Sequence, residues 1–143
     1  MVAVSTRTFL RPVHPVHAIL LAFPFPLFLG ALVGDLAYWS TFNVQWANFS
    51  SWLIAGALLV GAFAVLWGLV DVFRIGTTHN KRPAIYFAVL LAMWMFGLVN
   101  ALIHARDAWA TMPEGLYLSA IAALLALVAA WTGYSGFPAR EVE

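Results

Sequence analysis

Residues 53–70 read LIAGALLVGAFAVLWGLV, a run of 18 residues without a charged side chain, an amide or a hydroxyl. A helix rises about 1.5 Å per residue, so this run alone covers about 27 Å, close to the ~30 Å hydrocarbon core of a bilayer. A membrane β-strand would need alternating polarity over about ten residues, and the run does not alternate. The stretch therefore predicts a transmembrane helix.

The composition of the whole chain points to the same environment. Of 143 residues, 64% are hydrophobic and 9% are charged, whereas water-soluble domains carry about 25% charged residues. A water-soluble globule is therefore excluded. The formal net charge of +1 gives no electrostatic basis for binding nucleic acid. The chain has no cysteine, which excludes disulfides, thiolate metal sites, iron–sulfur clusters and c-type haem attachment.

Three more apolar stretches accompany the first one. We therefore expect an all-α fold, an integral membrane four-helix bundle in which residues 1–143 form a single transmembrane domain. Ser50 or Ser51 can cap the second helix, and Pro83 can open the third. The predicted helices cover residues 16–39, 51–73, 83–103 and 116–134.

The basic residues that flank these helices predict how the chain crosses the membrane. Six lie before the first helix, between the second and third, or after the fourth, while Arg106 alone lies on the opposite side. The positive-inside rule then places both termini in the cytoplasm of a bacterial inner-membrane, multi-pass protein. The six are Arg7, Arg11, Arg74, Lys81, Arg82 and Arg140.

Three short motifs resemble a known family. Residues 14–24 read HPVHAILLAFP, residues 34–36 read GDL and residues 68–71 read GLVD. Together they are similar to a bacterial family of small four-helix membrane proteins, the domain of unknown function 2231. The resemblance implies the four-helix fold and carries no mechanism, because the family label names no activity.

Polar residues near the cytoplasmic ends of the helices form one predicted layer. This inner polar layer holds His17, Asp71, Arg74 and His79. Asp71 and Arg74 are three residues apart on one helix face and could form a structural ion pair at the headgroup boundary. Alternatively, this pair orients His17 as a proton carrier or ligand.

A second predicted layer lies toward the outer side. This outer polar layer holds Asp35, Asn100, His104 and Asp107. The last three are spaced by four and three residues, so they share one helical stripe. If that stripe faces Asp35, the four side chains form a small polar pocket open to the outside; otherwise they simply meet interfacial water.

The histidines and tryptophans raise the question of a cofactor. Haem b needs two axial ligands at similar depth on facing elements, and His17 with His79 is the one plausible pair. A zinc or other metal site is less favoured, and no metal ligand is assigned. Trp67 and Trp94 lie deep in the predicted helices and could flank a quinone or a lipid tail, although packing explains most buried aromatics.

Proline and small residues mark two further features. Pro24 and Pro26 each remove a backbone hydrogen bond, so the first helix should kink or begin afresh there. The small residues allow close helix packing within the monomer, with a homodimer as the second use of these faces. They are Gly30, Gly34, Ala122 and Ala126.

Together these features predict an accessory or anchor subunit of a larger membrane assembly, one that could link a periplasmic dehydrogenase to quinone. The expected partners are membrane lipid and other membrane or periplasmic subunits. The alternative is a b-type cytochrome or a quinone-reactive electron-transfer protein that uses His17 and His79. The sequence contains no nucleophile elbow, phosphate loop or paired catalytic carboxylates, so we do not expect a self-contained enzyme.

Overall fold

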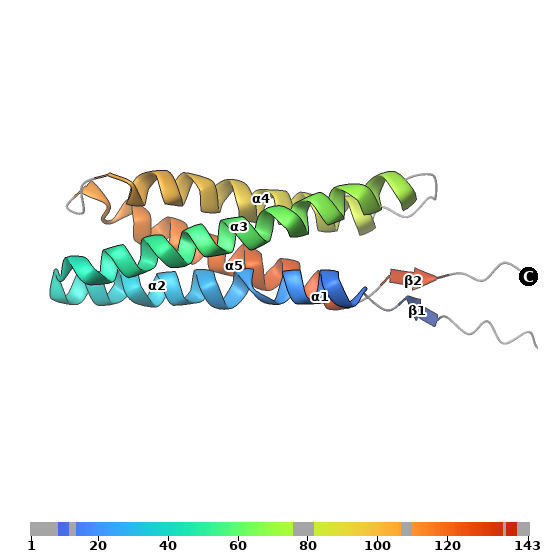
Figure 1. The fold of residues 1–143 in the computed structure, drawn as a ribbon, viewed down its shortest axis with the longest axis horizontal. Helices are drawn as coiled ribbons and strands as arrows, with labels where there is room; N and C mark the ends of the chain where they lie inside the picture. The colour runs from blue at the N-terminus through green and yellow to red at the C-terminus, as the bar shows by residue number, and fades with distance from the viewer. Residues whose placement is uncertain (1–8, 12–13, 76–81, 107–109, 136, 140–143) are drawn as a thin grey trace, which may run out of the picture.

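The computed structural model describes residues 9–11, 14–75, 82–106, 110–135 and 137–139. Within them, four long apolar helical stretches run side by side as an elongated bundle (Figure 1). The first consists of α1 (Pro15–Ala22) followed by α2 (Pro24–Thr41). The others are α3 (Val44–Ile75), α4 (Arg82–His104) and α5 (Glu114–Tyr134). The predicted four-helix membrane fold is confirmed.

The second spanning helix begins earlier than the sequence suggested. It starts at Val44 rather than at residue 51, and its first turn is capped by Asn43, whose Oδ1 accepts from the Gln45 backbone N–H at 3.1 Å. Ser50 is therefore not a cap; its hydroxyl donates to the Ala31 carbonyl of α2 at 3.0 Å. Hydropathy missed these two turns because polar side chains on an exposed helical turn do not prevent the helix from forming.

The first spanning helix is interrupted where its prolines lie. α1 ends at Ala22, Phe23 separates the two segments, and Pro24 occupies the first turn of α2. A proline is tolerated in a first turn because its missing N–H has no intrahelical acceptor there. The backbone of Phe23 stays in the helical region, at φ −81° and ψ −41°, so α2 continues the direction of α1 (Figure 1).

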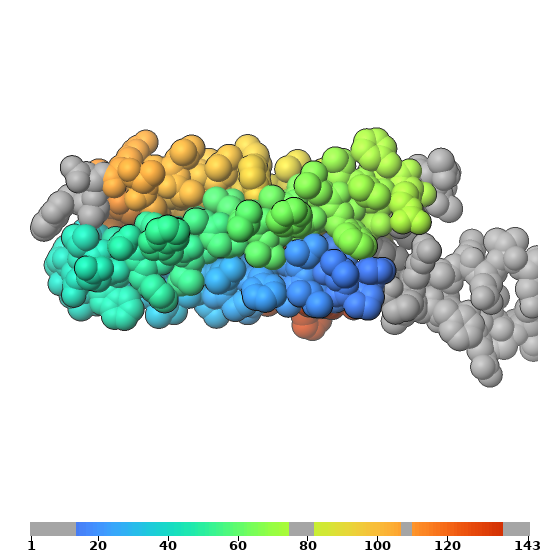
Figure 2. All heavy atoms as spheres, viewed as in Figure 1, coloured from blue at the N-terminus to red at the C-terminus, as the bar shows by residue number. Residues whose placement is uncertain are grey.

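The spanning helices form a ring in which each packs against two neighbours. α2 packs against α3 and α5, and α4 packs against the same two helices. α2 and α4 therefore face each other across the interior. In the space-filling view the atoms of α3 and its neighbours close over that interior (Figure 2).

Contacts between the first spanning helix and α4 repeat at a constant offset of 69 residues. His17 meets Tyr86, and Asp35 meets His104. Between them the ring of Phe28 lies against Gly97, where an added Cβ would be 2.6 Å from Phe28 Cζ. A constant offset means that the two helices run parallel and in register. Eighteen residues, about five helical turns, separate the two end contacts and place them on one face.

Small residues bring the helices close together elsewhere in the core. An added Cβ at Gly30 would lie 2.9 Å from Leu53 Cδ1, and one at Gly34 would collide with Ser50 Oγ, so this pair of glycines lies against α3. Ala122 and Ala126 of α5 are buried in the core. Large apolar side chains such as Leu59 and Leu124 instead point outward, as lipid-facing residues do.

Two short strands that the sequence analysis did not predict extend from one end of the bundle. β1 (Phe9–Arg11) pairs antiparallel with β2 (Phe137–Ala139), with Phe9 opposite Ala139. The pairing brings the segments that precede α1 and follow α5 together. Both strands therefore lie at the same end of the bundle, on the right in Figure 1.

Candidate functional site

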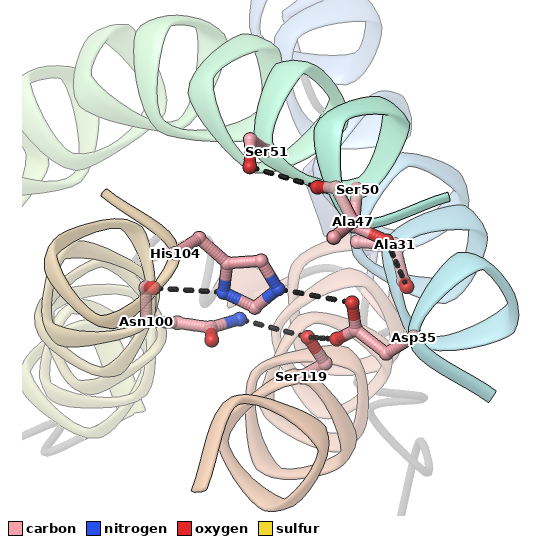
Figure 3. Close-up of polar contacts among 8 residues, drawn as sticks. All are labelled: Ala31, Asp35, Ala47, Ser50, Ser51, Asn100, His104 and Ser119. Atoms are coloured by element: carbon pink, nitrogen blue, oxygen red, sulfur yellow. Dashed lines mark hydrogen bonds and ion pairs between the residues drawn. The ribbon is translucent and has the colours of Figure 1, made fainter. Parts of the chain in front are cut away.

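Four buried polar side chains meet inside the bundle near the α2–α3 turn, and we call them the polar tetrad: Asp35, Asn100, His104 and Ser119. His104 Nε2 lies 2.9 Å from Asp35 Oδ1, and the Ser119 hydroxyl donates to Asp35 Oδ2 at 2.5 Å. Asn100 Nδ2 donates to Ser119 Oγ at 2.8 Å, and His104 Nδ1 lies 3.0 Å from the Asn100 backbone carbonyl. Figure 3 shows these groups converging from three helices.

Helical periodicity turns each of these side chains inward. On α2, Asp35 follows the buried Phe28 and Ala31 at spacings of seven and four. On α4, Asn100 and His104 continue the buried stripe that includes Gly97. Residues spaced by three, four or seven lie on the same face of a helix, so a helix that buries its apolar stripe also buries the polar residues in line with it.

The tetrad is inaccessible to solvent and almost fully hydrogen-bonded. Asp35, Asn100 and Ser119 are 0% exposed, and His104 is 8% exposed. Within the described residues, the acid–base contact closer than 4 Å joins Asp35 to His104, and it is an ion pair only when the imidazole is protonated. Asn100 Oδ1 is the exception, because it is buried and has no hydrogen-bond partner there. Buried polar groups are normally satisfied, so an unpaired acceptor marks a place where a donor would be stabilised.

The order of the hydrogen bonds limits the chemistry available to the tetrad. Asp35 stands between His104 and Ser119, so the serine hydroxyl points at a carboxylate and not at the imidazole. A serine nucleophile needs a neighbouring base that removes its proton, usually a histidine. This arrangement instead suits the holding or transfer of a proton between the carboxyl group and the imidazole.

A second polar cluster lies at the opposite end of the bundle. His17 Nε2 lies 2.7 Å from the Tyr86 hydroxyl, and the His17 ring stacks on Trp67 with centroids 5.5 Å apart. His17 is 4% exposed, and its Nδ1 has no hydrogen-bond partner among the described residues. Nearby, the Tyr134 hydroxyl donates to the Ala18 carbonyl at 2.8 Å.

The structure brings together part of each predicted layer. Of the outer layer, Asp35, Asn100 and His104 meet, while Asp107 lies outside the described residues. Of the inner layer, His79 also lies outside them.

The predicted partners Asp71 and Arg74 do not form an ion pair within 4 Å in the described part of the chain. Asp71 is half-buried and Arg74 is exposed.

The two deep tryptophans have separate contacts. Trp67 stacks on His17, whereas Trp94 Nε1 donates to the Leu58 carbonyl of α3 at 3.1 Å. Both indole rings are only partly buried. No three His, Cys, Asp or Glu side chains of the described ranges are grouped as metal ligands would be.

Sequence reasoning missed two residues of these clusters. Ser119 lies in line with the small residues Ala122 and Ala126 on α5, and a serine on such a ridge is a signal for an inward-facing hydroxyl. Tyr86 lies one turn into α4, and its pairing with His17 depends on the register of two helices that are distant in sequence.

Comparison with known proteins identifies a family for this chain. The family model described as a predicted membrane protein, DUF2231, matches residues 13–136, which include every residue of both clusters. No curated protein and no solved structure matches the chain. The family description specifies a membrane location and no activity.

Proposed function

This chain belongs to the DUF2231 family of predicted membrane proteins, and on that premise we propose that it is an accessory or anchor subunit of a larger assembly in a bacterial inner membrane. Its binding partner in that assembly is a periplasmic protein that docks at the α2–α3 end of the bundle. The kind of partner that such an anchor would hold at the membrane is an enzyme that passes electrons to membrane quinone.

The observation that carries this proposal is a surface hollow on the first turns of α3. Three aromatic rings in it are exposed, Trp46 at 41%, Phe49 at 51% and Trp52 at 73%. Amide groups line the same hollow, so it offers both apolar anchors and uncharged hydrogen-bonding groups, the combination typical of protein interfaces. We call it the docking surface, and its lining residues are Asn43, Gln45, Trp46, Asn48, Phe49 and Trp52.

The length of α3 supports a position at or beyond the membrane surface. Its 32 residues extend about 48 Å, compared with a hydrocarbon core of ~30 Å. About a third of the helix must therefore lie among headgroups or in water. Its polar residues are found in the amide-rich first turns and, at the other end, at Asp71 and Arg74. Aromatic rings at the membrane–water interface also anchor helices to lipid. An experiment on this surface must therefore distinguish a protein partner from lipid.

The proposed orientation places the docking surface in the periplasm. The strands β1 and β2 lie at the opposite end of the bundle. Arg74 at the end of α3 and Arg82 at the start of α4 lie at that end too, and the positive-inside rule assigns it to the cytoplasm. The chain lacks cysteine, so single-cysteine variants can be labelled without background. In intact spheroplasts we expect an impermeant maleimide to label Ser40→Cys and not Ser135→Cys, both at exposed positions; the reverse pattern would invert the topology.

The docking proposal is tested by photo-crosslinking in the native membrane. A photoreactive residue replaces Trp52 in the docking surface, and matched variants replace Trp131 at the other end and Leu59 on the lipid-facing side, which are 76% and 65% exposed. We expect position 52 to crosslink to one extramembrane protein and the controls to lipid. Crosslinks to lipid alone at position 52, or to a second copy of the chain, would overturn the proposal, the latter in favour of a homodimer.

The alternative function, a b-type cytochrome or quinone-reactive protein, has one specific observation in its favour. His17 keeps a buried Nδ1 without a hydrogen-bond partner among the described residues, although its Nε2 is hydrogen-bonded to Tyr86. The visible spectrum of the protein purified in mild detergent decides the cytochrome form of this alternative. A Soret band that disappears in His17→Ala would establish the cytochrome, and a featureless spectrum would eliminate haem.

A further inference from the structure

We propose that Asp35 and His104 together bind one proton at neutral pH, so that the polar tetrad is a proton-binding site buried near the α2–α3 end of the bundle. This inference is independent of the docking surface. It follows from counting the donors and acceptors in contact with each polar atom.

The Nδ1 atom of His104 carries a hydrogen. It lies 3.0 Å from the Asn100 backbone carbonyl oxygen, which can only accept a hydrogen bond. Nδ1 must therefore carry a hydrogen and donate it, because a bare nitrogen would place two lone pairs against each other. A neutral imidazole has one N–H, so in a neutral ring Nε2 is left bare.

His104 Nε2 also lies 2.9 Å from Asp35 Oδ1. An ionised carboxylate is acceptor-only, and a bare Nε2 is also an acceptor. The contact is a hydrogen bond only if one further proton lies between the two atoms. It belongs either to an imidazolium that faces a carboxylate or to a carboxylic acid that faces a neutral imidazole.

The serine of the tetrad cannot supply this proton. Ser119 Oγ accepts from Asn100 Nδ2 at 2.8 Å and directs its own hydrogen to Asp35 Oδ2 at 2.5 Å. Ser119 thus fixes the orientation of the carboxyl group and leaves Oδ1 to His104. The proton between Nε2 and Oδ1 must come from the surroundings, which makes the pair a binding site for it.

The charge of the surroundings favours keeping the proton. With it, the Asp35–His104 pair is neutral overall; without it, a carboxylate would be buried in an apolar bundle beside a neutral ring, which is costly. α2 contributes no other charged group here, and the part of α3 that faces α2 at this level contributes Ser50 and Trp46, which are uncharged. Near the ends of α4 and α5, Arg106 and Glu114 are exposed.

The test is solid-state NMR of the full chain in lipid bilayers at neutral pH, with ¹⁵N-labelled histidine and ¹³C-labelled aspartate. The His104 signals are identified by their loss in His104→Gln, and the Asp35 carboxyl signal by its loss in Asp35→Asn. We expect a protonated Nδ1 on His104, together with either a protonated Nε2 or a protonated Asp35 carboxyl group. A neutral ring that carries its hydrogen on Nε2 alone would overturn the proposal, since that form holds no additional proton.

The Asp35→Asn variant gives a second, independent readout. An asparagine amide has nearly the same shape and can donate to a bare Nε2, so we expect His104 to become a neutral ring with its hydrogen on Nδ1. If His104 in this variant keeps both ring protons, its proton does not depend on Asp35 and the proposal fails. Ser50→Ala, which removes a buried serine outside the tetrad, should leave the His104 signals unchanged.

Discussion

The most informative experiment replaces His104 by leucine in two backgrounds, the wild-type chain and the Asp35→Asn variant. In His104→Leu, Asp35 stays buried and hydrogen-bonded to Ser119 but has lost the group that neutralised it. Removing one partner of a buried ion pair costs about 3–5 kcal/mol, because the remaining charge is uncompensated. We therefore expect His104→Leu to lower the free energy of unfolding by about 3 kcal/mol.

The same change should cost far less when Asp35 has been replaced by asparagine. The contact is then an ordinary interhelical hydrogen bond, for which membrane proteins average about 0.6 kcal/mol and reach at most about 1.7 kcal/mol. The double-mutant cycle of Asp35→Asn and His104→Leu should thus give a coupling energy of about 2.5 kcal/mol. That value lies above the range of neutral hydrogen bonds between membrane helices.

The cycle can be measured by reversible unfolding in mixed micelles with increasing dodecyl sulfate. Seven tryptophans provide the fluorescence signal, and far-ultraviolet circular dichroism checks that each variant keeps its helices. A coupling energy below about 1 kcal/mol would refute the reasoning. In that case Asp35 and His104 would contribute no more than the average interhelical hydrogen bond.

Two further predictions concern packing and use the same unfolding assay. Gly97→Ala should destabilise the bundle by about 1–3 kcal/mol, because the added Cβ would lie 2.6 Å from Phe28 Cζ. Gly56→Ala, whose Cβ would lie 3.7 Å from its nearest neighbour, should be neutral or stabilising by up to about 1 kcal/mol; equal losses at both glycines would contradict the proposed close contact. Trp94→Phe should cost about 0.6 kcal/mol through loss of the bond to Leu58, and a loss above about 2 kcal/mol would show a further role for the indole.

The two polar clusters show where sequence patterns stop being informative. The spacing of Asn100 and His104 placed both on one helical stripe, and the structure brings that stripe to Asp35. The same reasoning joined Asp71 to Arg74, yet the structure does not pair them. A helical period determines which residues share a face, but it does not determine which face of another helix they meet.

Sequence patterns also predict some helix boundaries and miss others. Pro83 and Pro24 lie in the first turns of their helices, as a residue without an N–H prefers. The start of α3 at Val44 is instead set by the cap at Asn43, whose Oδ1 accepts from the Gln45 backbone N–H, a polar turn that hydropathy does not register. Hydropathy reports how long a segment stays in lipid and not how far its helix continues into the interface.

The sequence by itself determined that the chain crosses a bilayer in four helices. The hydrocarbon core of a bilayer requires long apolar stretches whose backbone groups are hydrogen-bonded within the segment. Such stretches can be recognised directly from the sequence. Only the tertiary structure decided that α2 and α4 face each other in register and that Ser119 and Tyr86 complete the two polar clusters. Those partners are 69 and 84 positions apart, and their meeting depends on how small residues let the helices approach, which no local pattern encodes.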